Sequence, residues 1–188
     1  MGNVRHSALH GLHSSAELPD GKGARHRSLD LVLGAALITM SLVAGLNFTF
    51  MAAVMPNLAG VDNRTFVGIM QRFNENPVFP VSFTLALLLT ILSVVLQASF
   101  ARGPALRWLI IALALYSIVL AITGALHLPL NELISRAGDP DQITDLAHLR
   151  AQVESPWVIG NIVRTGFSVA ALAALIRTTY LNGRTYRA

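Results

Sequence analysis

Four long apolar stretches divide the chain. They are Leu31–Val54, Val81–Phe100, Leu106–Leu126 and Trp157–Thr178. Each has about the 20 residues that a helix needs to cross a hydrocarbon core of roughly 30 Å. Backbone groups in hydrocarbon must satisfy one another's hydrogen bonds, so each stretch should be a helix. The pattern therefore predicts an all-α fold, a four-transmembrane-helix bundle.

The loop after the first stretch has an amphipathic pattern. Over Asn63–Asn74, apolar residues recur at helical spacing on one side, and polar residues share another side. The apolar side comprises Phe66, Ile69, Met70 and Phe73, and the polar side Arg64, Gln71 and Asn74. This spacing predicts a short helix that lies at the membrane interface.

The second half of the chain repeats this layout. Asp141–Glu154 is expected to form another loop helix, with Pro140 at its first position and acidic residues in its first turn. Pro56 and Pro129 follow the first and third stretches and are expected to break those helices. A shift of 73 residues relates the two halves, which leaves open whether they arose by duplication.

The basic residues indicate an orientation. Nine Lys and Arg residues lie in the two terminal segments and the short middle connection, against four in the other two loops. The positive-inside rule therefore predicts cytoplasmic termini, with both loop helices outside a bacterial-type plasma membrane. We expect a disordered cytoplasmic tail over 1–28, the membrane domain over 29–181 and a cytoplasmic tail over 182–188.

Composition supports a membrane protein and narrows its partners. The chain is 53% apolar and only 13% charged, whereas about a quarter of the residues in soluble domains are charged. Its basic residues do not alternate with aromatic ones, so we expect no nucleic-acid partner. The chain has no cysteine, which excludes disulfides and thiol chemistry. Membrane lipid, a second copy of the chain or another membrane subunit are the expected partners.

Polar residues in the apolar stretches gather toward the predicted outer side. Arg164 and Asn47 lie about two helical turns from that side, and His127 and Asn131 lie near it. The inner two-thirds of the bundle is expected to be apolar. Polar residues inside a membrane are costly and suggest function, so we expect a pocket for a flat, apolar, aromatic ligand with a few oxygens.

The candidate site consists of two kinds of residue. His127 and Arg164 are the candidate catalytic residues, because imidazole suits a base and guanidinium suits an oxyanion. The candidate substrate-binding residues are Asn47, Gln71, Asn74, Asn131, Trp157 and Asn161. No metal site is predicted, because His127 and His148 have no obvious third partner.

Structural roles remain open for several of these residues. Arg164 could instead extend toward the membrane surface or pair with Glu132 or Glu154, and His127 could simply lie at the membrane interface. Trp157 fits an aromatic belt. The two amides Asn47 and Asn161 could join helices by hydrogen bonds.

Several short motifs, in order, resemble the anthrone-oxygenase-like family of small four-helix membrane proteins. They are Asn47–Phe50 leading to Val54–Pro56, Met70–Asn74, Pro129–Leu133, and Trp157 through Arg164. The likeness covers roughly residues 30–180. It implies oxidation of a polyketide anthrone to a quinone by molecular oxygen, without metal, flavin or haem. Many members are expected to carry a histidine near the position of Asn161, and its absence here moves the role of base to His127.

A second function is compatible with the same residues. The chain could be a non-catalytic accessory or assembly subunit, or a protein that binds lipid or quinone. The loop helices could then cover a partner subunit.

Overall fold

The computed structural model describes residues 21–100 and 102–185, which form helices joined by short connections, with no strand in this part of the chain. The elements are α1 (Gly21–Thr49), η1 (Phe50–Val54), α2 (Met55–Leu58), α3 (Asn63–Asn74), α4 (Val78–Phe100), α5 (Pro104–Ile122), η2 (Thr123–His127), α6 (Leu128–Arg136) and α7 (Leu146–Thr185). The two η elements are single π-helical turns. Four helical segments are long and apolar enough to cross a membrane, which confirms the predicted bundle.

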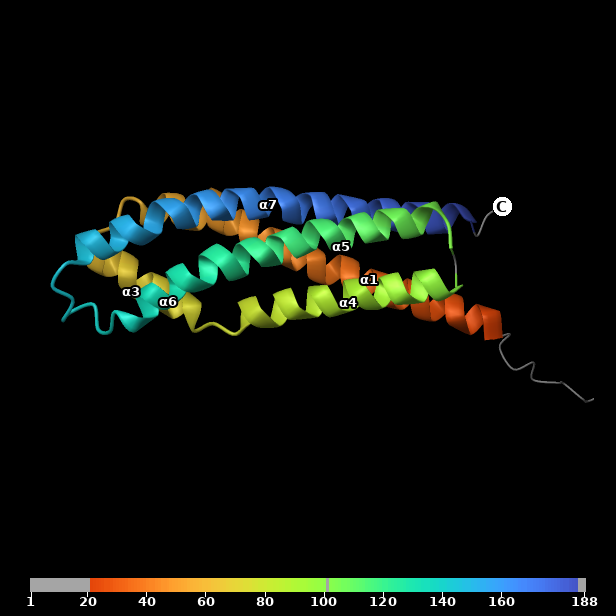
Figure 1. Cartoon of the computed structure of the whole chain (residues 1–188), viewed down its shortest axis with the longest axis horizontal. Helices are drawn as coiled ribbons and strands as arrows, with labels where there is room; N and C mark the ends of the chain where they lie inside the picture. The colour runs from red at the N-terminus through yellow and green to blue at the C-terminus, as the bar shows by residue number, and fades with distance from the viewer. Residues whose placement is uncertain (1–20, 101, 186–188) are drawn as a thin grey trace, which may run out of the picture.

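The four long helices form a ring in the order α1, α4, α5, α7 (Figure 1). Gly21 and the end of α7 lie at one end of the bundle, here called the tail end. The helices α3 and α6 lie at the opposite end, here called the loop end. Both termini of the described chain are thus on one side, while the side of the membrane that they occupy stays a prediction.

Two groups of apolar side chains hold the bundle together. One fills the middle of the ring, around Met40, Leu109 and Tyr116. The Tyr116 hydroxyl donates a hydrogen bond of 2.9 Å to the Phe83 carbonyl, which ties α5 to α4. The other group lies at the loop end, where Phe66 and Met70 of α3 pack on Ile134 of α6. Burying these side chains fixes α3 and α6 as a cap on the bundle.

The predicted loop helix Asn63–Asn74 is confirmed with the same bounds as α3. Its first turn is capped by Asp62, whose side chain accepts a hydrogen bond from the Thr65 amide. The second predicted loop helix, Asp141–Glu154, is helical only from Leu146 onward, and this part is not a separate helix but the beginning of α7. The chain from Asp139 to Asp145 is irregular, and the helix that begins at Leu146 continues through Pro156 to Thr185.

The expected breaks at Pro56 and Pro129 are also wrong. Each proline is the second residue of an α-helix that follows a π-helical turn without interruption. The π turn lengthens the hydrogen-bonded ring by one residue, so that the Met55 amide donates to Phe50 and the Leu128 amide to Thr123. Proline fits near the start of each new α-helix, where a backbone N–H would have no helical partner, because proline has no N–H.

The helices extend beyond the predicted membrane domain at both ends, and the domain limits themselves stay a prediction. Residues 21–28 of the expected tail are helical, and α7 extends through 182–185. Hydropathy marks only the part of a helix that lies in hydrocarbon, and helical hydrogen bonding continues beyond it. Residues 1–20 and 186–188 lie outside the described residues.

The inner part of the bundle is less apolar than predicted. Gln97 of α4 and Asn182 of α7 are buried near the tail end and exchange two amide hydrogen bonds of 2.9 and 3.3 Å. The prediction missed this pair because Asn182 lies beyond the fourth apolar stretch. The pair links two helices that are diagonal in the ring.

Candidate functional site

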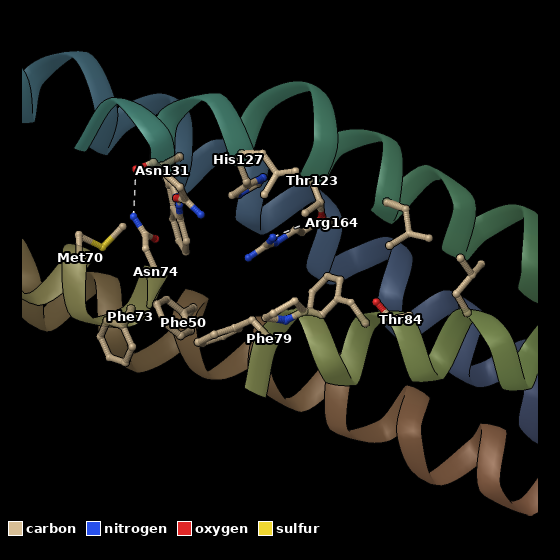
Figure 2. A pocket seen from close by; sticks show the side chains of 16 residues that line it. Phe50, Met70, Phe73, Asn74, Phe79, Thr84, Thr123, His127, Asn131 and Arg164 are labelled. Carbon is tan, nitrogen blue, oxygen red and sulfur yellow. Dashed lines mark hydrogen bonds between the residues drawn. The ribbon is translucent and has the colours of Figure 1, made fainter. Parts of the chain in front are cut away.

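A cavity of about 350 Å³ lies toward the loop end, between α4 on one side and α5, η2 and α6 on the other, with α7 contributing Arg164 (Figure 2). We call it the loop-end cavity. Its walls are mainly aromatic and aliphatic, and seven of the side chains that line it carry nitrogen or oxygen atoms. These are Asn74, Thr84, Thr123, His127, Asn131, Trp157 and Arg164. The cavity is therefore an apolar chamber with a few fixed polar groups, as is usual for small-molecule sites.

Arg164 reaches this cavity because of its position on α7. Trp157, Asn161 and Arg164 follow helical spacing, and all three are buried on the inner face of the helix. The Arg164 Nε donates to Asn161 Oδ1 at 3.0 Å, and Nη1 lies 3.4 Å from Thr123 Oγ1. The Nη2 group makes no hydrogen bond within the described residues, so part of the guanidinium is left for a ligand.

No described carboxylate pairs with Arg164. Glu154 binds Arg150 with a 2.7 Å contact, and Glu132 binds Arg136. The ion pair that was left open for Arg164 is therefore wrong. Its guanidinium carbon instead lies 5.5 and 5.7 Å from the ring centroids of Trp157 and Phe83. A buried cation with only neutral partners favours an anionic or strongly polarised oxygen in the cavity.

His127 is the last residue of the π turn η2 and is 1% exposed. Its Nδ1 lies 3.5 Å from the Ile122 carbonyl. A carbonyl only accepts, so this contact is a hydrogen bond only in the tautomer that carries its proton on Nδ1, in which Nε2 is an acceptor. Nε2 is buried and has no partner within the described residues. His127 lines the cavity, but its Nε2 is shielded and lies close to Gly160 of α7, so the ring has to move before this nitrogen can take a proton from a ligand.

Gly160 lets α7 and the π turn η2 approach each other closely. A Cβ atom at Gly160 would lie 2.4 Å from Leu126 Cδ2 and 2.9 Å from His127 Cε1. The His127 ring also meets Trp157 nearly edge-on, with 5.0 Å between centroids and 78° between planes. The absence of a side chain at Gly160 and the presence of an aromatic ring at Trp157 therefore set the position of the imidazole.

Trp157 and the asparagines next to it form a second polar edge of the cavity. The Trp157 Nε1 donates to Asn131 Oδ1 at 3.0 Å. Asn74 of α3 donates to the Asn131 carbonyl at 3.1 Å and to Ser135 Oγ at 3.2 Å. Trp157 is only 4% exposed, so its proposed place in an aromatic belt is wrong. These bonds orient α3, α6 and α7 around the cavity.

Three predicted binding residues do not line the cavity. Asn47 donates to Ser168 Oγ at 3.0 Å, and Asn161 donates to the Asn47 carbonyl at 3.1 Å. These two amides join α1 to α7, the helix-joining role left open for them, and Asn161 also holds Arg164. Gln71 donates to the carbonyls of Ile134 and Gly138, and so joins α3 to the α6 region.

The structure adds residues that sequence reasoning missed. Four phenylalanines line the cavity, namely Phe50, Phe73, Phe79 and Phe83, as do Thr84 and Thr123. The Phe50 ring packs at 4.9 Å from Phe73 and at 5.5 Å from both Phe79 and Trp157. Only Thr123 could have been found from the sequence, because it lies four residues before His127 and therefore on the same face of the helix. The phenylalanines come from three helices, and their meeting depends on packing that periodicity does not reveal.

Metal ligands do not cluster in the described part of the chain. No group of three or more His, Asp or Glu side chains there is arranged to hold a metal ion.

Comparison with known proteins identifies the family. The family model of anthrone oxygenase matches residues 76–174, which are more than half of the chain. The matched range runs from just before α4 to well within α7 and includes His127, Asn131, Trp157 and Arg164. No curated protein and no solved structure matched. The chain belongs to the anthrone oxygenase family.

Proposed function

We propose that this protein is a membrane oxygenase that converts an anthrone-like aromatic CH₂ group into a carbonyl with molecular oxygen. One observation carries the proposal. Two buried residues line the same apolar cavity: Arg164, which has no acidic partner among the described residues, and His127, whose Nε2 has no hydrogen bond there. A base can generate an anion from a bound ligand, and a cation can stabilise that anion. Membership of the anthrone oxygenase family indicates the type of reaction.

The cavity suits a flat, mostly apolar substrate. Its volume of about 350 Å³ lies in the usual range for small-molecule sites. Aromatic rings of Phe50, Phe73, Phe79 and Trp157 present edges and faces for stacking against a fused ring system. The few polar groups leave room for a ligand with a small number of oxygen atoms.

The first step is proton removal. In an anthrone, the CH₂ hydrogens lie opposite a carbonyl and are acidic because the resulting charge moves to that oxygen. His127 Nε2 would take the proton, and the free N–H groups of Arg164 would hold the enolate oxygen. Fixed donors act strongly on a developing oxyanion away from water.

The remaining steps need only molecular oxygen. The electron-rich ring carbon reduces O₂ in one-electron steps and forms a C–O bond, and the peroxide receives a proton from His127. Loss of the second ring proton breaks the O–O bond, a C=O group forms and water leaves. The sum is R₂CH₂ + O₂ → R₂C=O + H₂O, so the reaction balances without a further electron carrier.

Isotope labelling tests this assignment. Purified protein in detergent is mixed with anthrone under ¹⁸O₂, beside Arg164→Met protein and a protein-free control. We expect anthraquinone with one ¹⁸O atom, formed faster than in both controls. Unlabelled quinone, or labelled quinone formed at the protein-free rate, would contradict the proposal. Ligand binding without faster turnover would favour the alternative role as a lipid- or quinone-binding protein.

A further inference from the structure

The loop-end cavity adjoins a shallow hollow on the outside of α4. Pro80 and Thr84 line both the cavity and the hollow. The rest of the hollow is formed by Val81, Leu85 and Leu88, which lie on the same helix. The two spaces are therefore adjacent at Pro80 and Thr84.

The hollow faces the bilayer. Val81 is 61% exposed, Leu88 57% and Leu85 45%, and all three lie in a helix that is long and apolar enough to cross a membrane. Large apolar side chains that point away from a four-helix bundle contact lipid chains. An apolar molecule dissolved in the bilayer can thus reach this surface without crossing water.

The loop end of the cavity is covered more firmly. Phe66, Val67 and Met70 of α3 are buried against Ile134 of α6. Hydrogen bonds from Gln71 and Asn74 to α6 and its following turn reinforce this contact. A ligand arriving from water would have to open a packed and hydrogen-bonded layer.

Arg150 fastens the same cap to α7. Its guanidinium donates to the carbonyls of Leu58, Ala59 and Val61, and it pairs with Glu154. On the α4 side, the described residues show one such bond near Pro80 and Thr84, from the Tyr116 hydroxyl to the Phe83 carbonyl. This lipid-facing boundary is therefore held by fewer hydrogen bonds than the cap.

Thr84 differs in its hydrogen bonding from most of the Ser and Thr residues in the membrane-spanning helices. Most of them, such as Thr90 and Ser93 on the same helix, donate to the carbonyl four residues earlier. Thr84 makes no hydrogen bond within the described residues, and Figure 2 shows it on α4 at the edge of the cavity. Its hydroxyl is free to bind an oxygen atom of a passing ligand.

We propose that the ligand enters the loop-end cavity sideways from the bilayer, past Pro80 and Thr84 of α4, and not through the cap formed by α3 and α6. The ligand class is a membrane-dissolved, flat aromatic molecule with one or two oxygens. This inference rests on the ligand-binding part of the proposed function. It adds the route and the phase from which the substrate is taken.

Kinetics of ligand binding test the route. The protein is placed in lipid nanodiscs with Trp108→Phe, so that Trp157 is the remaining tryptophan, and is mixed with anthraquinone in a stopped-flow fluorimeter. Val81→Phe with Leu85→Phe fills the hollow without altering the cavity lining. Leu92→Phe with Val95→Phe adds the same bulk to lipid-facing positions of α4 outside both spaces.

We expect the hollow-filling pair to slow association and dissociation together by about tenfold, a change within the usual range for association rates. The dissociation constant should stay nearly constant, because access and not binding is altered. The control pair should leave both rates unchanged. Unchanged rates in the hollow-filling pair, or equal slowing in both pairs, would overturn the route alone. Failure of the unmodified protein to bind anthraquinone would overturn the ligand pocket together with the route.

Discussion

Arg164 carries a guanidinium group on the wall of an otherwise apolar cavity, and only part of that group is held by other side chains. Asn161 and Thr123 bind two of its nitrogens, and the third has no partner within the described residues. A buried arginine that served only the fold would be expected to have a carboxylate beside it. We infer that its charge serves a ligand.

Replacing Arg164 should separate binding from stability. Arg164→Met should weaken binding of the 2-hydroxyanthraquinone anion by roughly 10- to 100-fold, since a hydrogen bond to a charged group contributes about 1.5–3 kcal/mol. Arg164→Lys should fall between, because an ammonium lacks the planar fork. Titration in the Trp108→Phe background, monitored by Trp157 fluorescence, measures the affinities.

The unfolding free energy should change by less than about 1 kcal/mol in Arg164→Met. Removing an unpaired buried charge stabilises the protein, whereas the Asn161 oxygen loses its donor. Thermal unfolding in detergent measures this balance. Unchanged anion affinity, or unfolding that accompanies the lost affinity, would argue for a structural role.

The sequence predicted which residues share a helix face with Arg164, but not which groups the Asn47 and Asn161 side chains bind. Trp157, Asn161 and Arg164 share helical spacing, and one helix determines that relation. Whether Asn47 meets a ligand or Ser168 depends on the rotation of α1 against α7. That rotation is set by side chains more than a hundred residues apart, so periodicity predicts depth and not contact.

At the scale of elements, the close contact of α7 with η2 depends on Gly160. Gly160→Ala should destabilise the protein by roughly 1–3 kcal/mol, because an added methyl group in a packed contact forces side chains apart. It should also lower oxygenase activity by displacing His127. Denaturant unfolding and oxygen uptake measure the two effects.

Gly166 provides the matched control on the same helix. A Cβ atom there would meet nothing within 4 Å, so Gly166→Ala should be neutral or stabilising by up to about 1 kcal/mol. Equal destabilisation at both glycines would show that helix propensity, and not close approach, governs the contact.

Arg150 joins the outer part of α7 to the segment between α2 and α3. Its side chain is only 12% exposed and binds three backbone carbonyls besides Glu154. Arg150→Met should therefore cost about 2–4 kcal/mol, since breaking a buried pair leaves a charge and several acceptors unpaired. Hydrogen exchange should rise first in α3.

Arg136 is the matched control for Arg150. It also pairs with an acid four residues away on its helix, Glu132, but its side chain is 80% exposed. Arg136→Met should cost less than about 1 kcal/mol, as is usual for a surface pair. Similar losses in both variants would contradict the role assigned to the carbonyl contacts of Arg150.

The elements also show where local rules succeed. The bounds of α3 were predictable because its apolar face, polar face and N-cap lie within one short segment. The helix breaks predicted at Pro56 and Pro129 were wrong because a π turn before each proline lets the helix continue past it. No local sequence pattern predicts such a turn. The two π turns start at Phe50 and Thr123, which the predicted shift of 73 residues relates. This correspondence supports the likeness of the two halves.

At the scale of the whole molecule, the described termini share one end of the bundle, and the basic residues predict that this end is cytoplasmic. The chain has no cysteine, so single substitutions can report its orientation. Thr144→Cys at the loop end should react with a membrane-impermeant maleimide in intact cells. Gly183→Cys at the tail end should react only after the cells are permeabilised. The reverse pattern would contradict the orientation.

The central claim is that the loop-end cavity uses His127 as a base to oxidise its ligand with oxygen. Its most direct test is the initial rate of oxygen uptake by purified protein with anthrone, compared with His127→Leu protein and a protein-free control. Leucine removes the basic nitrogen and should leave the fold intact, because that nitrogen has no partner to lose within the described residues. We expect uptake well above the spontaneous rate, one O₂ consumed per anthraquinone formed, and a loss of about 10²–10⁴-fold in the variant. Equal rates for the two folded proteins would contradict the claim.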